Sequence, residues 1–486
     1  MKNDFPALPV AVIGAGPIGL AAAAHLVERG FTPLVFEAGP GVASHLESYR
    51  HVKLFSPWRY NIDPAARRLL EANGWTPPAQ DELPTAGNVV DRYLAPLAAL
   101  EPISRSLRFS HRVQDISREG FDKVKSSGRD DAPFVIRATT PNGVEEFRAW
   151  AVLDASGTWG KPNPIGANGL PAIGEHDAAA HIAYGMPDIL GALRTRYAGK
   201  RVLVAGAGHS AAGSLLALAK LAEAERGTRI VWTIRGHNFA RIFGGGANDA
   251  LAARGALGQR LKRLAEGGHL DVEADFRAVA IRETSGALVV EGRNADGSLR
   301  RIEGIDEIVV AAGGRPDLSM TAELRLKLDH WIESTEPLAP LIDPNVHSCG
   351  TVRPHGHREL QHPESRFYAI GAKSYGRAPN FLLATGHEQV RSVVAALAGD
   401  LVAADDVRLD LPKTGVCSTQ FDEASSGCCT SGAAEPIAVT SCCGGAPAQR
   451  EDACCARDEE AKDAGKSGCG CATQPRETVR ETACGR

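Results

Sequence analysis

The stretch Val10-Ala11-Val12-Ile13-Gly14-Ala15-Gly16-Pro17-Ile18-Gly19 decides the fold of this chain. Its apolar first part predicts a buried strand, and its glycines, in the pattern G-x-G-x-x-G, predict a tight turn. The alanine-rich residues 18–29 predict a helix that ends at Gly30, and residues 32–36 predict a second strand. Together these elements make a βαβ unit whose glycine pattern is typical of dinucleotide binding.

Each glycine of this turn has its own physical task. Gly14 allows the tight turn, Gly16 lets the backbone approach a pyrophosphate, and Gly19 lets the helix pack closely on the strand. The N–H groups and the partial positive charge at the start of the helix then favour the phosphates. A glycine-rich helix start without a ligand is the alternative interpretation. The predicted phosphate-binding residues are Gly14, Ala15, Gly16, Pro17 and Gly19.

An acidic residue, Glu37, ends the second predicted strand. A carboxylate at this place accepts hydrogen bonds from the ribose hydroxyls of a bound dinucleotide. We therefore expect Glu37 to complete the first nucleotide site.

A second βαβ unit is predicted from residue 201, with a strand over 201–205, a helix over 210–225 and a strand over 229–234. The turn between them reads Gly206-Ala207-Gly208-His209-Ser210-Ala211, in which alanine replaces the third glycine, as the motif allows. The last strand is followed by Arg235 rather than by an acid. An arginine can pair with a 2′-phosphate, which a carboxylate would repel, so this unit is expected to bind NADPH rather than NADH.

Two alternatives stay open in this second unit. Arg235 also fits an ordinary surface arginine at the end of a strand, and His209 fits a polar residue at a helix start better than a catalytic group. The predicted nucleotide-binding residues are Gly206, Gly208, Ser210 and Arg235.

Later segments predict how the two units are joined. The apolar strands at 149–155 and 305–312 both end in small residues and glycine, which predicts chain crossings near the cofactors at Gly157 and Gly314. We therefore expect an α/β chain with two Rossmann-like three-layer domains, the second inserted into the first. The predicted bounds are 1–199 and 313–410 for a FAD-binding domain, 200–312 for an NADPH-binding domain, and 411–486 for a disordered tail.

Composition and charge exclude several classes of function. The chain has 486 residues, with 43% hydrophobic and 23% charged residues, which is typical of a soluble globular protein. A net charge of −4 gives no reason to expect nucleic acid or a membrane surface as a partner. Neither a signal peptide nor a membrane span is expected.

Ten of the 11 cysteines lie after residue 412, and only Cys349 precedes them. A secreted disulfide scaffold would distribute its cysteines through the folded body, so the pattern indicates a reducing cytoplasm. The tail is poor in aromatic and branched residues, and such a segment buries too little apolar area to fold by itself.

The two glycine turns, the crossings at 155–157 and 312–314 and the lead-in at 197–201 together resemble the class B flavin monooxygenases over about residues 8–400. More narrowly, the segments 55–61 and 380–386 and the cysteine-rich tail are similar to the flavoprotein monooxygenases of arsenic-resistance gene sets. The resemblance implies FAD on the first unit and NADPH on the second. It also implies transfer of one oxygen atom from O2 to a small soft nucleophile.

The resemblance also implies residues around the flavin. Gly371 follows an apolar strand and Thr385 opens a predicted helix, whose N-terminus would point at the flavin pyrimidine; a plain helix capped by Thr385 is the alternative. Asn61, Trp58 and Tyr60 are candidates for the flavin site, against the alternatives of a turn-forming asparagine and two core aromatics. The family's stretch before the second glycine turn is present only in altered form, at 181–191.

Paired cysteines predict a separate task for the tail, because thiolates select soft, thiophilic ions such as trivalent arsenic. Zinc or copper binding and a tail without function are the alternatives. The same cysteines keep open a flavoprotein reductase of a thiophilic metal or a disulfide, and a non-enzymatic metalloid sensor. A homodimer is the default expectation. The candidate metalloid ligands are Cys428, Cys429, Cys442, Cys443, Cys454 and Cys455.

Overall fold

The computed structural model contains two domains, each built on a five-stranded parallel sheet. It describes residues 8–409 except 238, 244–248, 250, 285, 347–351 and 379–381. The candidate metalloid ligands of the tail and the first two residues of the segment 380–386 therefore lie outside the described residues. Within the described part of the chain, no helix is long and apolar enough to cross a bilayer.

The first domain is built on a parallel sheet in the order β16-β7-β1-β2-β3. Val10 of the central strand pairs with Pro33 on one side and with Ala151 on the other. A crossover must therefore leave and return to the sheet, as the βαβ pattern predicts. The strands are β1 (Val10–Ile13), β2 (Pro33–Phe36), β3 (Leu107–Arg108), β7 (Ala151–Asp154) and β16 (Phe367–Ala369).

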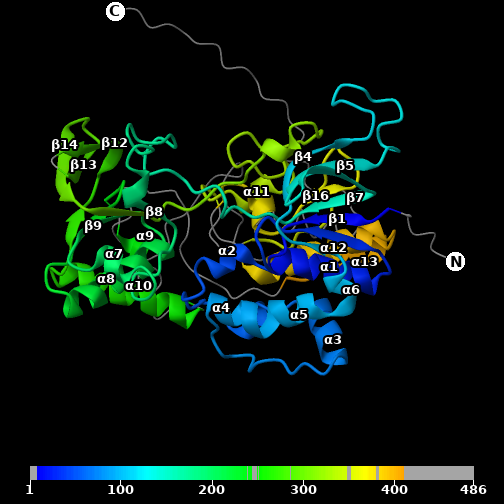
Figure 1. The fold of residues 1–486 in the computed structure, drawn as a ribbon, viewed down its shortest axis with the longest axis horizontal. Coiled ribbons are helices and arrows are strands. Elements are labelled where there is room, and N and C mark those ends of the chain that lie inside the picture. Colours follow the sequence, from blue (N-terminus) through cyan, green and yellow to red (C-terminus); the bar gives the residue numbers. More distant parts are fainter. Residues whose placement is uncertain are drawn as a thin grey trace, which may run out of the picture. The chain divides into compact units, whose positions relative to one another are not determined.

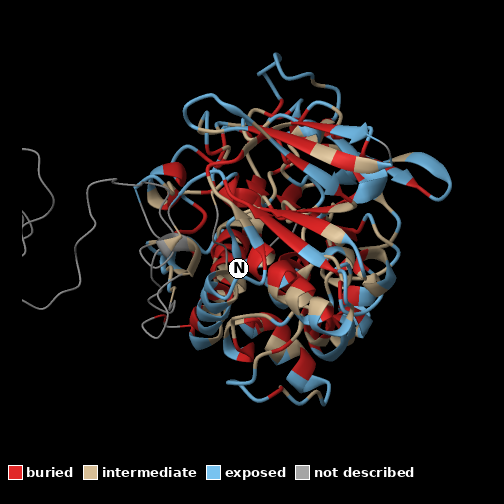
Figure 2. Ribbon diagram, turned by 90° about the vertical axis from the view of Figure 1, so that its left-hand side faces the viewer, coloured by how far each residue is buried: buried red, intermediate tan, exposed pale blue. Residues whose placement is uncertain are grey.

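Both faces of this sheet are covered, which gives three layers (Figure 1). Val10 and Val12 pack against the helical layer, whereas Ala11 and Ile13 pack against a three-stranded antiparallel sheet. This alternation of side chains explains why β1 is apolar throughout. Figure 2 shows the sheet strands as mostly buried and the outer loops as exposed. The antiparallel strands are β4 (Arg112–Arg118), β5 (Phe134–Thr140) and β6 (Gly143–Ala149).

The helical layer is centred on α1 (Pro17–Glu28), which packs against α12 (Leu383–Leu397) and α3 (Pro64–Ala72). The helix expected from residue 385 begins two residues earlier, so Thr385 lies inside its first turn rather than capping it. The remaining helices of the layer are α2 (Ser44–Glu47), α4 (Ala86–Val89), η2 (Val90–Leu94), α5 (Ala95–Ala99), α6 (Glu101–Ser104) and α13 (Leu401–Asp405). Short turns are η1 (Trp58–Tyr60), η5 (Ser319–Thr321), α11 (Ala339–Ile342) and η6 (Gly371–Tyr375).

The second domain repeats this plan with a parallel sheet in the order β11-β10-β9-β15-β8. Val202 and Val204 of β9 face the helices, and Leu203 and Ala205 face three antiparallel strands. The sheet strands are β8 (Ile182–Tyr184), β9 (Arg201–Ala205), β10 (Arg229–Thr233), β11 (Asp271–Glu273) and β15 (Glu307–Val310). The antiparallel strands are β12 (Arg277–Thr284), β13 (Ala287–Arg293) and β14 (Leu299–Ile305). The helical elements are η3 (Ala179–His181), α7 (Arg194–Tyr197), α8 (His209–Ala224), α9 (Ala240–Phe243) and α10 (Ala252–Glu266).

The expected domain boundary at residue 200 lies too late in the chain. Strand β8 pairs with β15 in the second sheet, and Ile165 and Ala172 belong to the second hydrophobic core. The reason is long-range pairing: residues 182–184 form a strand only because β15, more than a hundred residues later, supplies its hydrogen-bonding partner. Apart from the position of this boundary, the fold agrees with the prediction of two α/β domains with parallel sheets.

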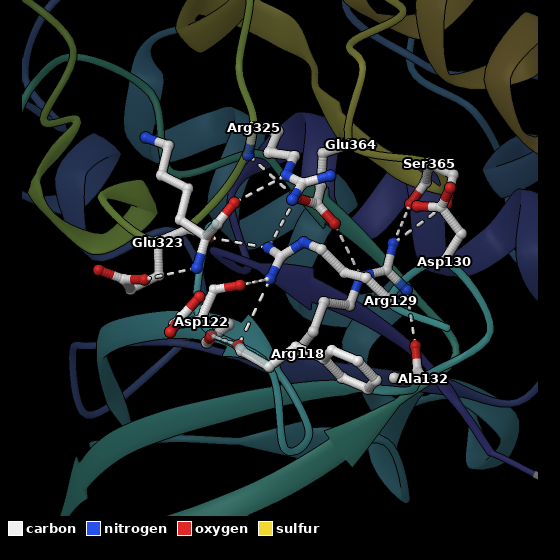
Figure 3. A network of polar contacts seen from close by, with 12 residues as sticks. Arg118, Asp122, Arg129, Asp130, Ala132, Glu323, Arg325, Glu364 and Ser365 are labelled. Atoms are coloured by element: carbon white, nitrogen blue, oxygen red, sulfur yellow. Dashed lines mark hydrogen bonds and ion pairs between the residues drawn. The ribbon is translucent and has the colours of Figure 1, made fainter. Parts of the chain in front are cut away.

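A buried cluster of charges ties the antiparallel sheet of the first domain to the segment before β16 (Figure 3). Glu364 accepts from Arg118 Nε at 2.7 Å and from Arg129 Nη2 at 2.9 Å, and all three side chains are almost fully buried. Arg118 also lies over the ring of Phe134. One carboxylate between two arginines is a strong hydrogen-bonding arrangement, so it fixes the return of the chain to the first sheet.

Candidate functional site

The first glycine turn has the geometry that a pyrophosphate requires. Gly14 has φ +98°, and a side chain there would approach the Ala155 carbonyl oxygen to 2.9 Å. A Cβ on Gly19 would overlap the carbonyl oxygen of Gly14. A Cβ on Gly16, in contrast, would meet nothing within 4 Å, so this glycine leaves an open surface at the N-terminus of α1. The conformation of Gly14 thus fits the expected tight turn, that of Gly19 the close packing of helix on strand, and that of Gly16 the expected approach of a phosphate.

Glu37 organises this turn from the end of β2. Its side chain is buried, and its Oε2 accepts from the Ala15 N–H at 2.9 Å while its Oε1 accepts from the Gly39 N–H at 2.8 Å. Each carboxylate oxygen has a second lone pair, so both can still accept from a ribose hydroxyl. The residues present therefore fit the adenosine and pyrophosphate part of FAD.

The second glycine turn has the same backbone plan. Gly206 has φ +143°, and a Cβ there would overlap the Ala311 carbonyl oxygen. A Cβ on Gly208 would meet nothing within 4 Å, and α8 begins at the next residue, so Ser210 lies in its first turn. Arg235 follows β10, is exposed and donates to the Ala167 carbonyl at 3.2 Å. The structure fits a nucleotide at this turn, and a 2′-phosphate contact by Arg235 stays a prediction.

A ring contact joins the second turn to the first domain. The ring centroids of His209 and Phe55 lie 5.0 Å apart. Partial desolvation of the ring lowers the pKa of His209, and the nearby Arg254 lowers this pKa further. The imidazole is therefore neutral at pH 7. The glycine motif predicted only that His209 lies at the start of a helix. Its ring contact with Phe55 joins two domains, so no local sequence pattern could reveal it.

The three residues proposed for the flavin site are arranged differently from expectation. Asn61 is fully buried, donating from Nδ2 to the Ser56 carbonyl at 2.8 Å and accepting at Oδ1 from Ser56 Oγ at 2.8 Å. Trp58 is also fully buried in the helical core, and Tyr60 is half-buried with Arg59 beside its ring. Asn61 thus ties its own loop together, and for Asn61 and Trp58 a contact with flavin would require the loop to open.

The turn after β16 brings Gly371 beside α1. Gly371 has φ +69°, and a Cβ there would lie 3.0 Å from the side chain of Ile18. The Gly371 N–H donates to Gln389 Oε1 at 2.8 Å, and Gln389 is fully buried on α12. Thr385, also buried on α12, is the other residue predicted here. The turn is therefore held tightly between α1 and α12, at the carboxyl edge of the sheet where ligands of this fold class bind.

The same turn contains a buried lysine, Lys373, that the sequence patterns did not predict as a site residue. Lys373 Nζ lies 3.1 Å from Asp154 Oδ2, and both side chains are almost fully buried. The same nitrogen donates to Ser156 Oγ at 3.1 Å and to the Asp317 carbonyl at 2.6 Å. An aspartate that ends an apolar strand was the available signal, since such a group needs a cation when it is buried. Its partner could not be identified, because it lies more than two hundred residues away.

The two crossings also contain the predicted glycines. Gly157 has φ +70°, and a Cβ on Gly314 would approach the Thr158 carbonyl oxygen to 2.6 Å. The crossings thus lie against each other, next to both glycine turns: Ala155 contacts Gly14, and Ala311 contacts Gly206. Among the described residues, no group of three or more His, Cys, Asp or Glu side chains could hold a metal ion.

Solved structures with the same fold catalyse two kinds of reaction. A bacillithiol disulfide reductase from Bacillus cereus is 18% identical and superimposes with a TM-score of 0.59, covering 81% of this chain and 99% of that one. A cadaverine monooxygenase of desferrioxamine biosynthesis from Erwinia amylovora, bound to FAD, is 14% identical with a TM-score of 0.56, covering 85% and 99%. An ornithine N-hydroxylase from Kutzneria sp. 744 is 16% identical with a TM-score of 0.53, covering 82% and 99%. At these identities, the likeness shows the fold alone.

No curated protein sequence matches the chain. The sequence does match the pyridine nucleotide-disulphide oxidoreductase family over residues 11–349, which include both glycine turns, both crossings and the whole second domain. The chain therefore belongs to the pyridine nucleotide-disulphide oxidoreductase family, and it is an oxidoreductase that uses FAD and NADPH.

Proposed function

We propose that this protein is a monooxygenase that transfers one oxygen atom from O2 to a soft nucleophile, with a trivalent organoarsenical as the favoured substrate. The reaction would consume the substrate, O2, NADPH and a proton, and would yield the oxygenated substrate, water and NADP⁺. FAD supplies the chemistry of this class, because it accepts a hydride from NADPH and, when reduced, reacts with O2.

The observation that carries the proposal is the absence of cysteine from residues 1–348. A disulfide reductase passes its electrons from flavin to a disulfide through thiols of its own, since thiol–disulfide exchange needs an attacking thiolate. Both glycine turns, the whole second domain and four of the five strands of the first parallel sheet precede the first cysteine, Cys349. An oxygenase needs no such dithiol, and residues 1–348 contain both glycine turns without a cysteine pair.

The protein's own part in such a reaction is binding, orientation and exclusion of water. The turns at Gly16 and Gly208 leave open surfaces for two pyrophosphates, and Phe55 and His209 lie between the two domains. A soft nucleophile attacks with a lone pair and needs no proton removed beforehand, so a general base is not required. The neutral His209 imidazole adds no positive charge where it contacts Phe55.

The tail supports the choice of substrate. Ten cysteines after residue 412, six of them in adjacent pairs, give thiolates that prefer soft ions. We propose that the pairs at 428–429, 442–443 and 454–455 collect a trivalent arsenical and raise its concentration near the active site. The work of the enzyme would then lie in arsenic resistance, in a reducing cytoplasm.

The test is the rate of NADPH oxidation with methylarsenite, arsenite, an amine and a sulfide, each in air and without O2, with product mass measured. We expect turnover with methylarsenite only in air, and a product heavier by one oxygen atom. Equal turnover without O2 would contradict oxygenation. Turnover in air that yields only hydrogen peroxide, with each of the four compounds unchanged, would contradict the proposed substrates.

A flavoprotein reductase of a thiophilic metal or disulfide is the second candidate, and the tail cysteines favour it. Their pairs could supply the missing thiols to a flavin, and a disulfide reductase is among the similar folds. A chain that ends at residue 412 separates the two candidates. The oxygenase should keep its maximal rate at saturating substrate and lose only affinity, whereas a tail-dependent reductase should lose turnover altogether. A metalloid sensor without catalysis would show no substrate-stimulated NADPH oxidation in either chain.

A further inference from the structure

The two crossings between the domains form one antiparallel ribbon. Pro162 and Gly314 pair as an isolated antiparallel bridge, and on either side the Asn163 N–H donates to the Gly313 carbonyl at 2.9 Å and the Arg315 N–H to the Lys161 carbonyl at 3.0 Å. Asn163 adds side-chain bonds to the Ala312 carbonyl and to Arg315 Nε. The two segments that join the domains are therefore hydrogen-bonded to each other rather than independent.

Lys373 holds the end of this ribbon that enters the first domain. Its ammonium group has three donors, and the structure gives it three oxygen partners: Asp154 at the end of β7, Ser156 in the first crossing and the Asp317 carbonyl in the second crossing. The turn that carries Lys373 is itself fixed, because Ser374 and Gly371 bond to the buried Gln389. One cation therefore connects the first sheet to both crossings.

We infer that Lys373 is a positioning residue that sets how the second domain is held against the first during transfer of hydride from NADPH to FAD. A buried ammonium group cannot exchange its partners for water as a surface lysine can, so its ion pair with Asp154 and its two hydrogen bonds resist rotation of the ribbon. Buried ion pairs contribute little net stability but can select one arrangement among several. The inference rests on the FAD and NADPH dependence of the enzyme and is independent of whether it oxygenates or reduces its substrate.

The surface pair between Lys161 and Asp317 provides a matched control. It joins the same two crossings, with Lys161 Nζ 3.6 Å from Asp317 Oδ1, but both side chains are about half exposed. Exposed ion pairs contribute little because water and salt screen them. Removal of Lys161 should therefore leave the ribbon in place, whereas removal of the buried lysine should release it.

The variant that tests the inference is Asp154→Asn together with Lys373→Met in the full-length enzyme. The double change removes both charges, so no unpaired buried charge remains to unfold the domain. Three quantities are measured: hydrogen–deuterium exchange of the free protein, the rate of flavin reduction by NADPH without O2, per bound flavin, and the dissociation constant of NADPH.

We expect amide exchange in residues 155–163 and 311–317 to rise at least tenfold, with β1 and β9 unchanged. The rate of flavin reduction should fall at least tenfold, while the dissociation constant of NADPH stays within twofold because its turn lies inside the second domain. The Lys161→Met enzyme should match the unsubstituted enzyme in all three.

An unchanged flavin-reduction rate, or unchanged exchange in both crossings, would overturn the inference. Faster exchange throughout the first domain, including β1, would overturn it as well, because Lys373 would then stabilise the domain as a whole. If the double variant binds no FAD, Ser156→Ala decides instead: it removes one bond, and at least threefold faster exchange in residues 155–163 supports the inference while no change overturns it.

Discussion

The two glycine turns share one backbone plan but differ in how firmly the protein holds them. In the first, Ala15 and Pro17 are buried, and Glu37 bonds to the backbone on both sides of the site. In the second, Ala207, Gly208 and His209 are exposed. The first turn is thus prepared in advance and suits a cofactor that stays bound. The second suits a nucleotide that enters and leaves in each catalytic cycle.

The largest difference should come from the third position of each motif. Gly19→Ala places a Cβ where the Gly14 carbonyl oxygen lies, so the helix must move off the strand and FAD should be lost. The second motif already has alanine at this position, and Ala211→Gly should keep both nucleotides. Flavin absorbance per polypeptide after gel filtration measures the outcome. Full flavin content in the Gly19→Ala protein would contradict the packing argument.

Glu37→Ala should weaken the first turn through the backbone. The substitution leaves the amides of Ala15 and Gly39 without their acceptor, at roughly 1–3 kcal/mol for each buried unsatisfied group. The FAD-free protein should therefore unfold at lower denaturant concentration, and FAD should dissociate faster. Arg235→Ala removes the residue at the corresponding position of the second turn and serves as the control, with no change in either measurement. Equal stability of the two variants would show that Glu37 does not organise its turn.

Acid should destabilise the first domain through two buried histidines. Burial lowers the pKa of His387 and of His362 from 6.5 to about 4. Between pH 6.5 and 4, the unfolded chain therefore binds protons that the folded chain does not, and the free energy of unfolding falls as the pH drops. The complete loss would be roughly 3 kcal/mol per histidine.

Urea unfolding at pH 7, 6 and 5 tests this dependence. His387→Leu should flatten the fall in unfolding free energy, whereas His51→Gln, at an exposed position, should leave it unchanged. The same slope in all three proteins would mean that these buried rings do not govern the acid response.

The smallest expected effect concerns nucleotide choice. Arg235→Ala should lower the preference for NADPH over NADH by about 10- to 100-fold, since a hydrogen bond to a charged group contributes roughly 1.5–3 kcal/mol. Arg229→Ala, at the exposed start of the same strand, is the matched control. The ratio of kcat/KM for the two nucleotides is the measurement. An unchanged ratio would show that Arg235 is a surface residue that does not select the nucleotide.

Local patterns predicted the two βαβ units well. The strands β1 and β9 and the helices α1 and α8 lie within one or two residues of expectation, because apolar runs and glycine turns act over short distances. The roles of Gly14 and Gly206 in the turns also agree with their backbone angles.

Long-range contacts account for what the sequence did not reveal. The boundary at residue 200 was wrong because β8 exists through its pairing with β15. Lys373 was missed because its partner, Asp154, lies in a distant strand. Asn61 is a different case: its amide bonds to Ser56 of the same loop, and its role at the flavin stays a prediction.

The most direct test of the proposed function is a single turnover in separate steps. The enzyme is reduced with one equivalent of NADPH without O2, methylarsenite is added, and ¹⁸O2 is admitted afterwards. An oxygenase should keep its flavin reduced after the substrate is added, and should then oxidise it on contact with ¹⁸O2 and place one labelled oxygen atom in the product. Oxidation of the flavin by the substrate before O2 is admitted would contradict the account and identify a reductase.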